Sequence, residues 1–252
     1  MAEKRLAEIR VLLAGAGFEL TPEDWSFFGQ LRRRIRERNA VMNLTRLTGE
    51  RDFFVKHLLD SMLPFLRLPV LRELGTGLLA ADVGSGAGFP GFALARLRPS
   101  WDVALVERTR KRAAFLEETA AALDLSNVFV VPLDAAEAGR TVPLLRHRCD
   151  LAVARAVGRL DAVTRSAAPL LRPGGLLVHY KGGRVDPGEL ERGRRAARQL
   201  GLRMEEPVGY ELPPDAQRSA VIAVAGRPSD RRCGAADRRK RARRKSRGGR
   251  ER

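Results

Sequence analysis

From residue 78 onward, apolar runs of strand length alternate with amphipathic segments of helical length. Five strands are predicted, at 78–83, 102–107, 127–131, 151–156 and 175–182. The helices predicted between and after them are 90–97, 111–125, 160–171 and 186–201. Apolar strands joined by helices are typical of a mainly parallel sheet covered on both faces, so the fold class is α/β. A last apolar run at 219–225 follows a short return after residue 200 and predicts an edge hairpin.

Residues 1–66 have helical patterning instead. The first segment carries a short apolar stripe, formed by Ala7, Ile9, Leu12 and Leu13. A second helix is predicted from a Thr21 cap, followed by proline, to about Asn39. Its expected buried residues are Trp25, Phe28, Leu31 and Ile35. A third helix is predicted from a Thr48 cap to about Leu63, just before Pro64.

The chain therefore divides into three predicted parts, which are a helical extension at 1–66, an α/β domain at 67–226 and a basic tail at 227–252. The formal net charge of the chain is +17, of which the tail carries +10. The tail has no apolar periodicity and is expected to be disordered. Such a charge balance predicts an acidic partner, most simply nucleic acid, although a tail of this kind adds only sequence-independent affinity.

Other classes of protein are disfavoured by the composition. No apolar stretch approaches 18 residues, so no membrane span is expected. The N-terminal stretch MAEKRLAEIR is charged and is not a secretory signal. The two cysteines, Cys149 and Cys233, lie far from each other and from any cluster of metal ligands. We therefore expect neither a disulfide framework nor a metal site, and a reducing cytoplasm.

The glycine-rich stretch AADVGSGAGFPGFALARL, at 80–97, can be interpreted in two ways. Gly86, Gly88 and Gly91 form G-x-G-x-x-G, which is typical of dinucleotide-binding loops. Asp82 with Gly84, Gly86 and Gly88 forms D-x-G-x-G-x-G, which is typical of loops that hold S-adenosylmethionine. In both cases the loop joins a strand to a helix at the edge of the sheet where α/β proteins bind ligands. A purely structural role for these glycines is the third possibility.

Three features favour S-adenosylmethionine over NAD. Pro90 removes a backbone N–H that a pyrophosphate would use. The carboxylate of Asp82 suits a ligand with an ammonium and a sulfonium group. The stretch LLRPGGLLV, at 170–178, resembles the turn before the fifth strand of class I methyltransferases. Glu107 ends the second strand 19 residues after Gly88, and an acid there can hold ribose hydroxyls in either cofactor.

Several stretches together resemble one family. They are NLTRLTGERDFFVKHLLDS (43–61), DVGSGAGFPGFALA (82–95), VERTRKRAAFL (106–116), ARAVGRLDAV (154–163), LLRPGGLLVHYKG (170–182) and RSAVIAV (218–224). The chain is similar to the bacterial small-subunit rRNA guanine-N7 methyltransferases, also called glucose-inhibited division protein B. The resemblance covers about residues 5–226. It implies a class I, Rossmann-like methyltransferase with a seven-stranded sheet, and a cytoplasmic enzyme that methylates one guanine N7 near the decoding site of 16S rRNA.

The same resemblance assigns site residues. Gly84 and Phe89 would line the cofactor, and Ala135 and Ala136 would lie where the family contacts the adenine. Because the family often has a glutamate in that segment and Glu137 is close by, the register there stays open by one or two residues. Arg155 matches an arginine beside the cofactor and the substrate pocket. The expected partner is 16S rRNA or the small ribosomal subunit, and the enzyme is expected to be a monomer.

The chemistry of such a reaction requires no general base, because guanine N7 carries a lone pair and no proton. Catalysis would depend on positioning and on the local electrostatic field. Arg155 could contact guanine O6 or a phosphate, or it could form an ordinary salt bridge at a strand end. Lys181 and Arg218 are candidate RNA contacts, and the alternative for both is a solvated surface cation. The target base must leave any stack to reach the pocket.

Two further groups are noted in the helical extension. His57 and Asp60 are three residues apart and could pair, although helix packing is the favoured interpretation. An arginine run, consisting of Arg32, Arg33, Arg34, Arg36 and Arg38, is either a solvated face or a source of phosphate contacts.

Two alternative functions stay open on the sequence alone. One is a small-molecule methyltransferase or NAD-dependent enzyme of the same architecture. The other is a non-catalytic RNA-binding protein of ribosome assembly. The sequence also leaves open whether naked rRNA or an assembled particle would be the substrate.

Overall fold

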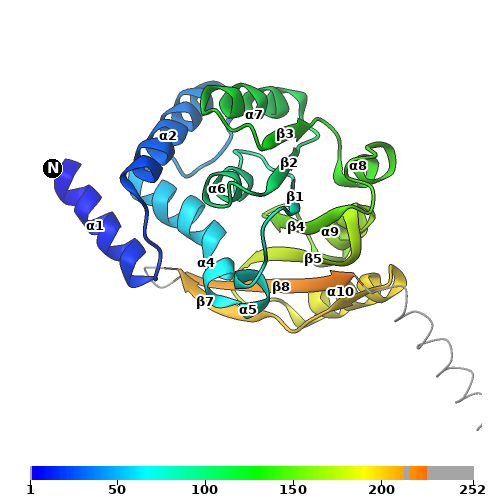
Figure 1. Cartoon of the computed structure of the whole chain (residues 1–252). Coiled ribbons are helices and arrows are strands. Elements are labelled where there is room, and N and C mark those ends of the chain that lie inside the picture. Colours follow the sequence, from blue (N-terminus) through cyan, green and yellow to red (C-terminus); the bar gives the residue numbers. More distant parts are fainter. Residues whose placement is uncertain (1, 213–215, 226–252) are drawn as a thin grey trace, which may run out of the picture.

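The computed structural model describes residues 2–212 and 216–225, and the predicted basic tail lies outside them. A twisted sheet occupies the centre of the molecule, with helices on both faces (Figure 1). Its strands are β1 (Leu79–Val83), β2 (Asp102–Val106), β3 (Val128–Val131), β4 (Cys149–Arg155), β5 (Leu171–Gly182), β6 (Leu202–Met204), β7 (Val208–Leu212) and β8 (Ala216–Ala225). Among the described residues, no helix combines the length and apolar character needed to cross a membrane.

The strand order is β3-β2-β1-β4-β5-β8-β6, with β7 also paired to β8. β1 to β5 are parallel, and β8 runs antiparallel to β5. β6 and β7 pair with opposite ends of β8, since Leu202 faces Ala225 and Val208 faces Ala220. The sheet therefore has the expected seven positions, and two short strands share the last one. The predicted edge hairpin is confirmed.

The two faces of the sheet pack against different helices. Ala81 and Val83 point toward a core shared with α8 (Ala135–Thr141), α9 (Leu160–Ala167) and α10 (Pro187–Gln199). Ala80 points the other way, into a core shared with α6 (Gly91–Leu97), α7 (Arg110–Ala122) and the N-terminal helices. Alternate residues of one strand thus serve opposite faces, as the pleat requires. The short helix α8 was not predicted from the sequence.

The N-terminal helices are α1 (Ala2–Gly15), α2 (Pro22–Met42), α3 (Glu50–Asp52), α4 (Asp60–Arg67) and α5 (Pro69–Arg72). The Thr21 cap is confirmed, because its hydroxyl accepts a hydrogen bond from the Asp24 N–H at 3.2 Å. α2 lies beside α7 (Figure 1), where Arg34 donates to the Glu118 carbonyl. Because these helices share their apolar core with one face of the sheet, the predicted boundary at 66/67, which falls within α4, does not separate two cores.

The structure corrects three of the predicted helix ends. α2 continues to Met42 and ends at Asn43, which has a left-handed φ of 48°. The third predicted helix starts after Gly49, not Thr48, and runs through a π-helical segment (Phe53–Leu59) into α4. It also passes Pro64 and ends at Arg67. A proline inside a helix costs about 3 kcal/mol, and here the buried apolar residues on both sides of it offset that cost.

Candidate active site

The glycine loop follows β1 and is shaped by three residues with positive φ. Gly84, Gly86 and Gly88 have φ of 70°, 55° and 93°, a region that favours glycine. The loop is tied to β2, because the Gly84 N–H donates to the Val106 carbonyl at 2.8 Å. The Gly86 N–H donates to Glu107 Oε2 at 3.0 Å. The turn is therefore held in place by backbone bonds and by one buried carboxylate.

The three glycines do not serve the same purpose. A Cβ on Gly86 would meet nothing closer than the Gly84 carbonyl oxygen at 3.8 Å, so this position opens onto free space. A Cβ on Gly88 would lie 2.1 Å from the Phe92 ring. Gly88 therefore allows α6 to pack closely under the loop, and it does not line the cleft described below.

Asp82 lies beneath the loop. It is 1% exposed, and its Oδ2 accepts the Gly91 N–H at 2.9 Å at the start of α6. Its Oδ1 is buried without a hydrogen-bond partner among the described residues. Burial raises the pKa of Asp82 to about 7, against the opposing effect of the Gly91 hydrogen bond. Asp82 thus fixes the loop to the helix and, like Gly88, is not placed on the wall of the cleft.

A cleft runs along the carboxyl ends of the strands and has two chambers. The Arg155 chamber has a volume of about 470 Å³ and lies between the glycine loop, the ends of β4, β5 and β8, and the N-terminal helices. The Glu107 chamber, of about 520 Å³, lies over the ends of β1, β2, β3 and β4 and against α9. Gly84, Arg112 and Ala156 line both. Each chamber is within the size range of small-molecule sites.

The Glu107 chamber combines acidic side chains with small apolar ones. Glu107 Oε1 accepts the Thr109 N–H at 2.8 Å, and together with the Gly86 bond this fixes the carboxylate. Each oxygen still has a second acceptor site, which suits a pair of hydroxyl groups. Ala135 is buried and lines this chamber, whereas Ala136 does not. Asp134, which caps α8 through the Glu137 N–H at 2.9 Å, also lines it and was not predicted.

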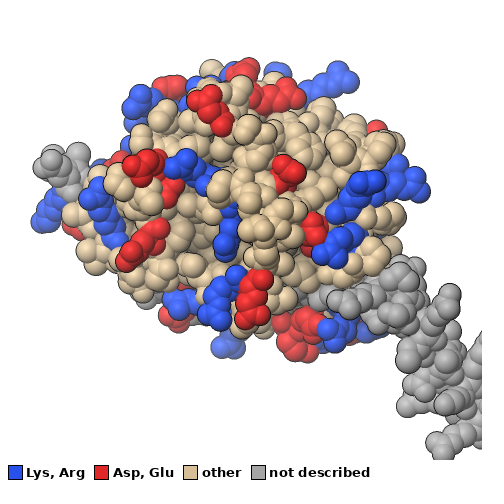
Figure 2. All heavy atoms as spheres, viewed as in Figure 1, with Lys and Arg blue, Asp and Glu red and all other residues tan. Residues whose placement is uncertain are grey.

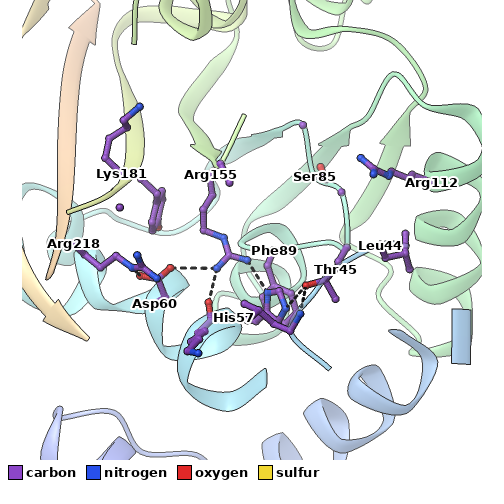
Figure 3. A pocket seen from close by; sticks show the side chains of 18 residues that line it. Leu44, Thr45, His57, Asp60, Ser85, Phe89, Arg112, Arg155, Lys181 and Arg218 are labelled. Atoms are coloured by element: carbon purple, nitrogen blue, oxygen red, sulfur yellow. Dashed lines mark hydrogen bonds and ion pairs between the residues drawn. The ribbon is translucent and has the colours of Figure 1, made fainter. Parts of the chain in front are cut away.

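Arg155 is at the centre of the other chamber (Figure 3). Its Nη1 donates to the Lys56 carbonyl at 2.8 Å and to Asp60 Oδ2 at 3.3 Å. Its Nη2 lies 3.0 Å from His57 Nδ1. The side chain is 15% exposed and lies over the Phe89 ring, with its Cζ 5.9 Å from the ring centroid. The salt bridge anticipated as the alternative for Arg155 is therefore present, and the same side chain also faces the chamber.

The side chains of His57 and Asp60 contact Arg155 and do not pair with each other. His57 Nε2 lies 3.1 Å from Thr45 Oγ1, and the His57 ring is stacked on Phe89 with centroids 5.3 Å apart. Burial, and secondly the Arg155 charge, lower the pKa of His57 to about 3, so the ring is neutral. Asp60 is 5% exposed and accepts the Tyr210 hydroxyl at 3.3 Å. These residues come from the helical extension, which is therefore part of the chamber wall.

The remaining predicted cations also line the Arg155 chamber. Arg218 Nε lies 3.3 Å from Asp60 Oδ1. Lys181 Nζ donates to Glu189 at 2.8 Å and to the Gly158 carbonyl at 3.3 Å. Arg112 was not predicted, and its side chain has no hydrogen-bond or ion-pair partner within residues 2–212 and 216–225. Five cationic side chains and one carboxylate line the chamber, and the five are Lys56, Arg112, Arg155, Lys181 and Arg218.

The comparisons with known proteins agree with this geometry. Residues 26–207 match the family model described as rRNA small subunit methyltransferase G. The chain belongs to this family. It is 36% identical over 217 residues to a ribosomal RNA small subunit methyltransferase G of Carboxydothermus hydrogenoformans, covering 86% of this chain and 89% of the relative. It is 41% identical over 211 residues to the protein of the same description from Deinococcus deserti, covering 81% and 82%.

A solved structure supports the fold. A point mutant of the 16S rRNA (adenine(1408)-N(1))-methyltransferase of Catenulisporales acidiphilia superposes with a TM-score of 0.51 at 18% identity. The match covers 61% of this chain and 87% of that chain. The fold is thus that of class I methyltransferases, as expected. Family membership makes the chain an S-adenosylmethionine-dependent rRNA methyltransferase and decides against the NAD interpretation of the glycine loop.

Proposed function

We propose that this enzyme methylates N7 of one guanine in the decoding-region loop of 16S rRNA, in the cytoplasm and as a monomer. The Glu107 chamber would hold the cofactor and the Arg155 chamber the target base. The observation that carries this proposal is the guanidinium of Arg155, which faces a chamber directly joined to the Glu107 chamber. Its donors suit an acceptor atom on the base, and none of the described residues there is arranged to take up a proton.

The residues present fit S-adenosylmethionine. Gly86, which leaves open space where a Cβ would stand, allows close approach of the backbone, and Gly84 lines both chambers. Glu107 retains acceptor sites for ribose hydroxyls. Asp134 and Ala135 close the far side of the Glu107 chamber and would contact the adenine. Phe89 lines the Arg155 chamber, so its expected contact with the cofactor would be made where the two chambers join. When bound, S-adenosylmethionine supplies a methyl group on a positively charged sulfur, activated for in-line displacement.

The lack of a general base agrees with guanine N7 as acceptor, because its lone pair is free at neutral pH. His57 is neutral, but its Nδ1 is occupied by Arg155. Asp60 is engaged by Arg155, Tyr210 and Arg218. The side chains therefore bind and orient the base, and none has to move a proton.

Arg155 would select guanine over adenine. A guanidinium only donates hydrogen bonds, so it pairs with O6 of guanine and faces the amino group of adenine unfavourably. The usual bidentate contact of arginine with O6 and N7 would block the methylated atom. The proposal therefore requires a contact to O6 that leaves N7 open.

Contacts to the RNA backbone would come from outside the chamber. Within the arginine run of α2, Arg32 pairs with Glu50 at 2.9 Å and Arg38 pairs with Glu118, whereas Arg33 and Arg36 are exposed. On the face seen in Figure 2, basic side chains are interspersed with acidic ones instead of forming one broad patch. Phosphate contacts of this dispersed kind position the RNA without reading its sequence.

The proposal is tested with purified protein, labelled S-adenosylmethionine, and either naked 16S rRNA or small subunits that lack the modification. We expect label in one guanine of the decoding region, which mapping of the modified nucleotide identifies. RNA with 7-deazaguanine at that position should accept no methyl group, whereas inosine, which keeps O6 and N7, should accept it. Methylation elsewhere, or on an exocyclic atom, would overturn the assignment.

A further inference from the structure

A chain of hydrogen bonds joins the loop after α2 to Arg155 through His57. The Leu47 N–H donates to Thr45 Oγ1 at 3.0 Å, and Thr45 Oγ1 lies 3.1 Å from His57 Nε2. On the other side of the ring, His57 Nδ1 lies 3.0 Å from Arg155 Nη2. Leu47, Thr45, His57 and Arg155 all line the Arg155 chamber, so this path is part of its wall.

The partners determine the protonation of the ring. The guanidinium of Arg155 can only donate, so His57 Nδ1 must accept and carries no proton. The proton of the neutral ring is therefore on Nε2 and is donated to Thr45 Oγ1. A proton on Nδ1 would place two donors face to face, beside a fixed positive charge.

Three acceptors from one short segment determine which donors of Arg155 remain free. The Lys56 carbonyl and Asp60 Oδ2 occupy Nη1, and His57 occupies one N–H of Nη2. The Nε–H and the second Nη2–H have no acceptor among the described residues. Because the guanidinium is planar and rigid, fixing three of its five donors also fixes the direction of the other two.

His57 also contacts the glycine loop. Its ring is nearly parallel to the Phe89 ring, at an interplanar angle of 23°, and Phe53 packs edge-on against Phe89 with centroids 5.5 Å apart. The π-helical segment that carries Phe53 and His57 thus contacts both the loop and Arg155. π-Helical turns of this kind are frequent at functional sites.

We propose that His57 is a positioning residue for methyl transfer, acting through its Nδ1 acceptor, which aims the free donors of Arg155 at O6 of the target guanine. The inference rests on the proposed function. It assigns to the helical extension a direct part in the reaction, because the acceptor that orients the arginine of β4 comes from residues before the sheet begins.

A matched pair of variants separates this role from simple packing. In His57→Asn the side-chain oxygen can take the place of Nδ1 and accept from Arg155. In His57→Gln the amide can take the place of Nε2 and contact Thr45, which leaves Arg155 without this acceptor. Both variants remove the ring that stacks on Phe89. We expect kcat within about threefold of the unmodified enzyme for Asn, and a fall of roughly 10- to 100-fold for Gln. Equal losses in both would overturn the proposal.

A second measurement uses only one of the two variant enzymes and changes the RNA instead. The target guanine is replaced by 2-aminopurine, which lacks O6, and kcat is measured for the unmodified enzyme and for His57→Gln. If His57 acts through the contact of Arg155 with O6, the two changes together cost little more than either alone. Independent, multiplying losses would overturn it. S-adenosylhomocysteine affinity and thermal unfolding of each variant confirm that the cofactor site is intact.

The two proposals fail differently. If the unmodified chain places no methyl group on guanine N7 of 16S rRNA, the proposed function is wrong. If it does so while the Asn and Gln variants behave alike, only the role of His57 is wrong.

Discussion

The two chambers of the cleft are built over very different distances along the chain. In the Glu107 chamber the carboxylate is fixed by the N–H groups of Gly86 and Thr109, which are 21 and 2 residues away. In the Arg155 chamber the guanidinium is fixed by Lys56, His57 and Asp60, which are 99, 98 and 95 residues away. The first chamber forms within successive β–α units, whereas the second requires the N-terminal helices to dock. Catalysis and cofactor binding should therefore respond separately to substitution.

The largest difference between the effect on kcat and the effect on cofactor affinity is expected for Arg155→Ala. Removing a donor aimed at the reacting base should lower kcat about 10²- to 10³-fold, or roughly 3–4 kcal/mol. The affinity for S-adenosylhomocysteine, measured by calorimetry, should change less than about threefold, because the Glu107 chamber keeps its acceptors. The kcat of Arg155→Lys should lie between those of the unmodified enzyme and Arg155→Ala, because lysine keeps the charge and loses the planar fork. A large loss of cofactor affinity would show that the chambers are not independent.

Asp82, the buried acid beneath the glycine loop, gives a pH-dependent prediction. The pKa of Asp82 is raised to about 7, while the unfolded value is near 4, so between these values the folded protein holds a proton that the unfolded chain releases. The stabilising contribution is complete below pH 4 and is lost as the pH rises to 7.

Asp82→Asn serves as the reference for this effect. The free energy of unfolding of the unmodified protein, relative to Asp82→Asn, should fall by about 2 kcal/mol from pH 4.5 to pH 6.5. Urea denaturation at several pH values measures it. A difference that rises or stays level over this range would show that Asp82 is ionised in the fold.

Glu107→Gln tests the Glu107 chamber, whose contacts join residues that are close together in the chain. The substitution replaces one acceptor with an amide that faces a backbone N–H, so cofactor affinity should fall about 10- to 30-fold. With saturating cofactor, kcat should stay within about threefold, because Arg155 is untouched. Isothermal titration and single-turnover kinetics distinguish the two quantities. A drop in kcat with unchanged affinity would reverse the assignment of the chambers.

The smallest effect is expected from a chain that ends at Gly226. It lacks the segment of net charge +10, whose attraction to RNA depends on salt and not on sequence. Affinity for 16S rRNA at low salt should fall about three- to tenfold, and the slope of log affinity against log salt should become shallower. Target choice and kcat should not change. Loss of target choice would place part of the specificity outside the cleft.

The same contrast explains what the sequence could predict. The strands, their order of appearance and the acid at the end of β2 follow from apolar patterning and from spacing to the glycines. The sequence could not show that Asp82 and Gly88 face α6 and not the cleft, because that depends on which face of the pleat α6 covers. Nor could it pair His57 with Arg155, since the contact depends on docking of segments almost 100 residues apart. The H-x-L-D-S stretch at 57–61, which contains His57 and Asp60, was the sequence signal that could have pointed to these two site residues.

Only Gly84, Arg112 and Ala156 line both chambers, as far as the described residues extend. Elsewhere the two sets of lining residues differ, and one hydrogen bond, from the Gly86 N–H of the Arg155 chamber to Glu107, joins them. Because the N-terminal helices share their core with the sheet, they cannot be exchanged as a unit, but substitutions at their chamber-lining positions could change which nucleobase is captured and leave the donor pocket as it is.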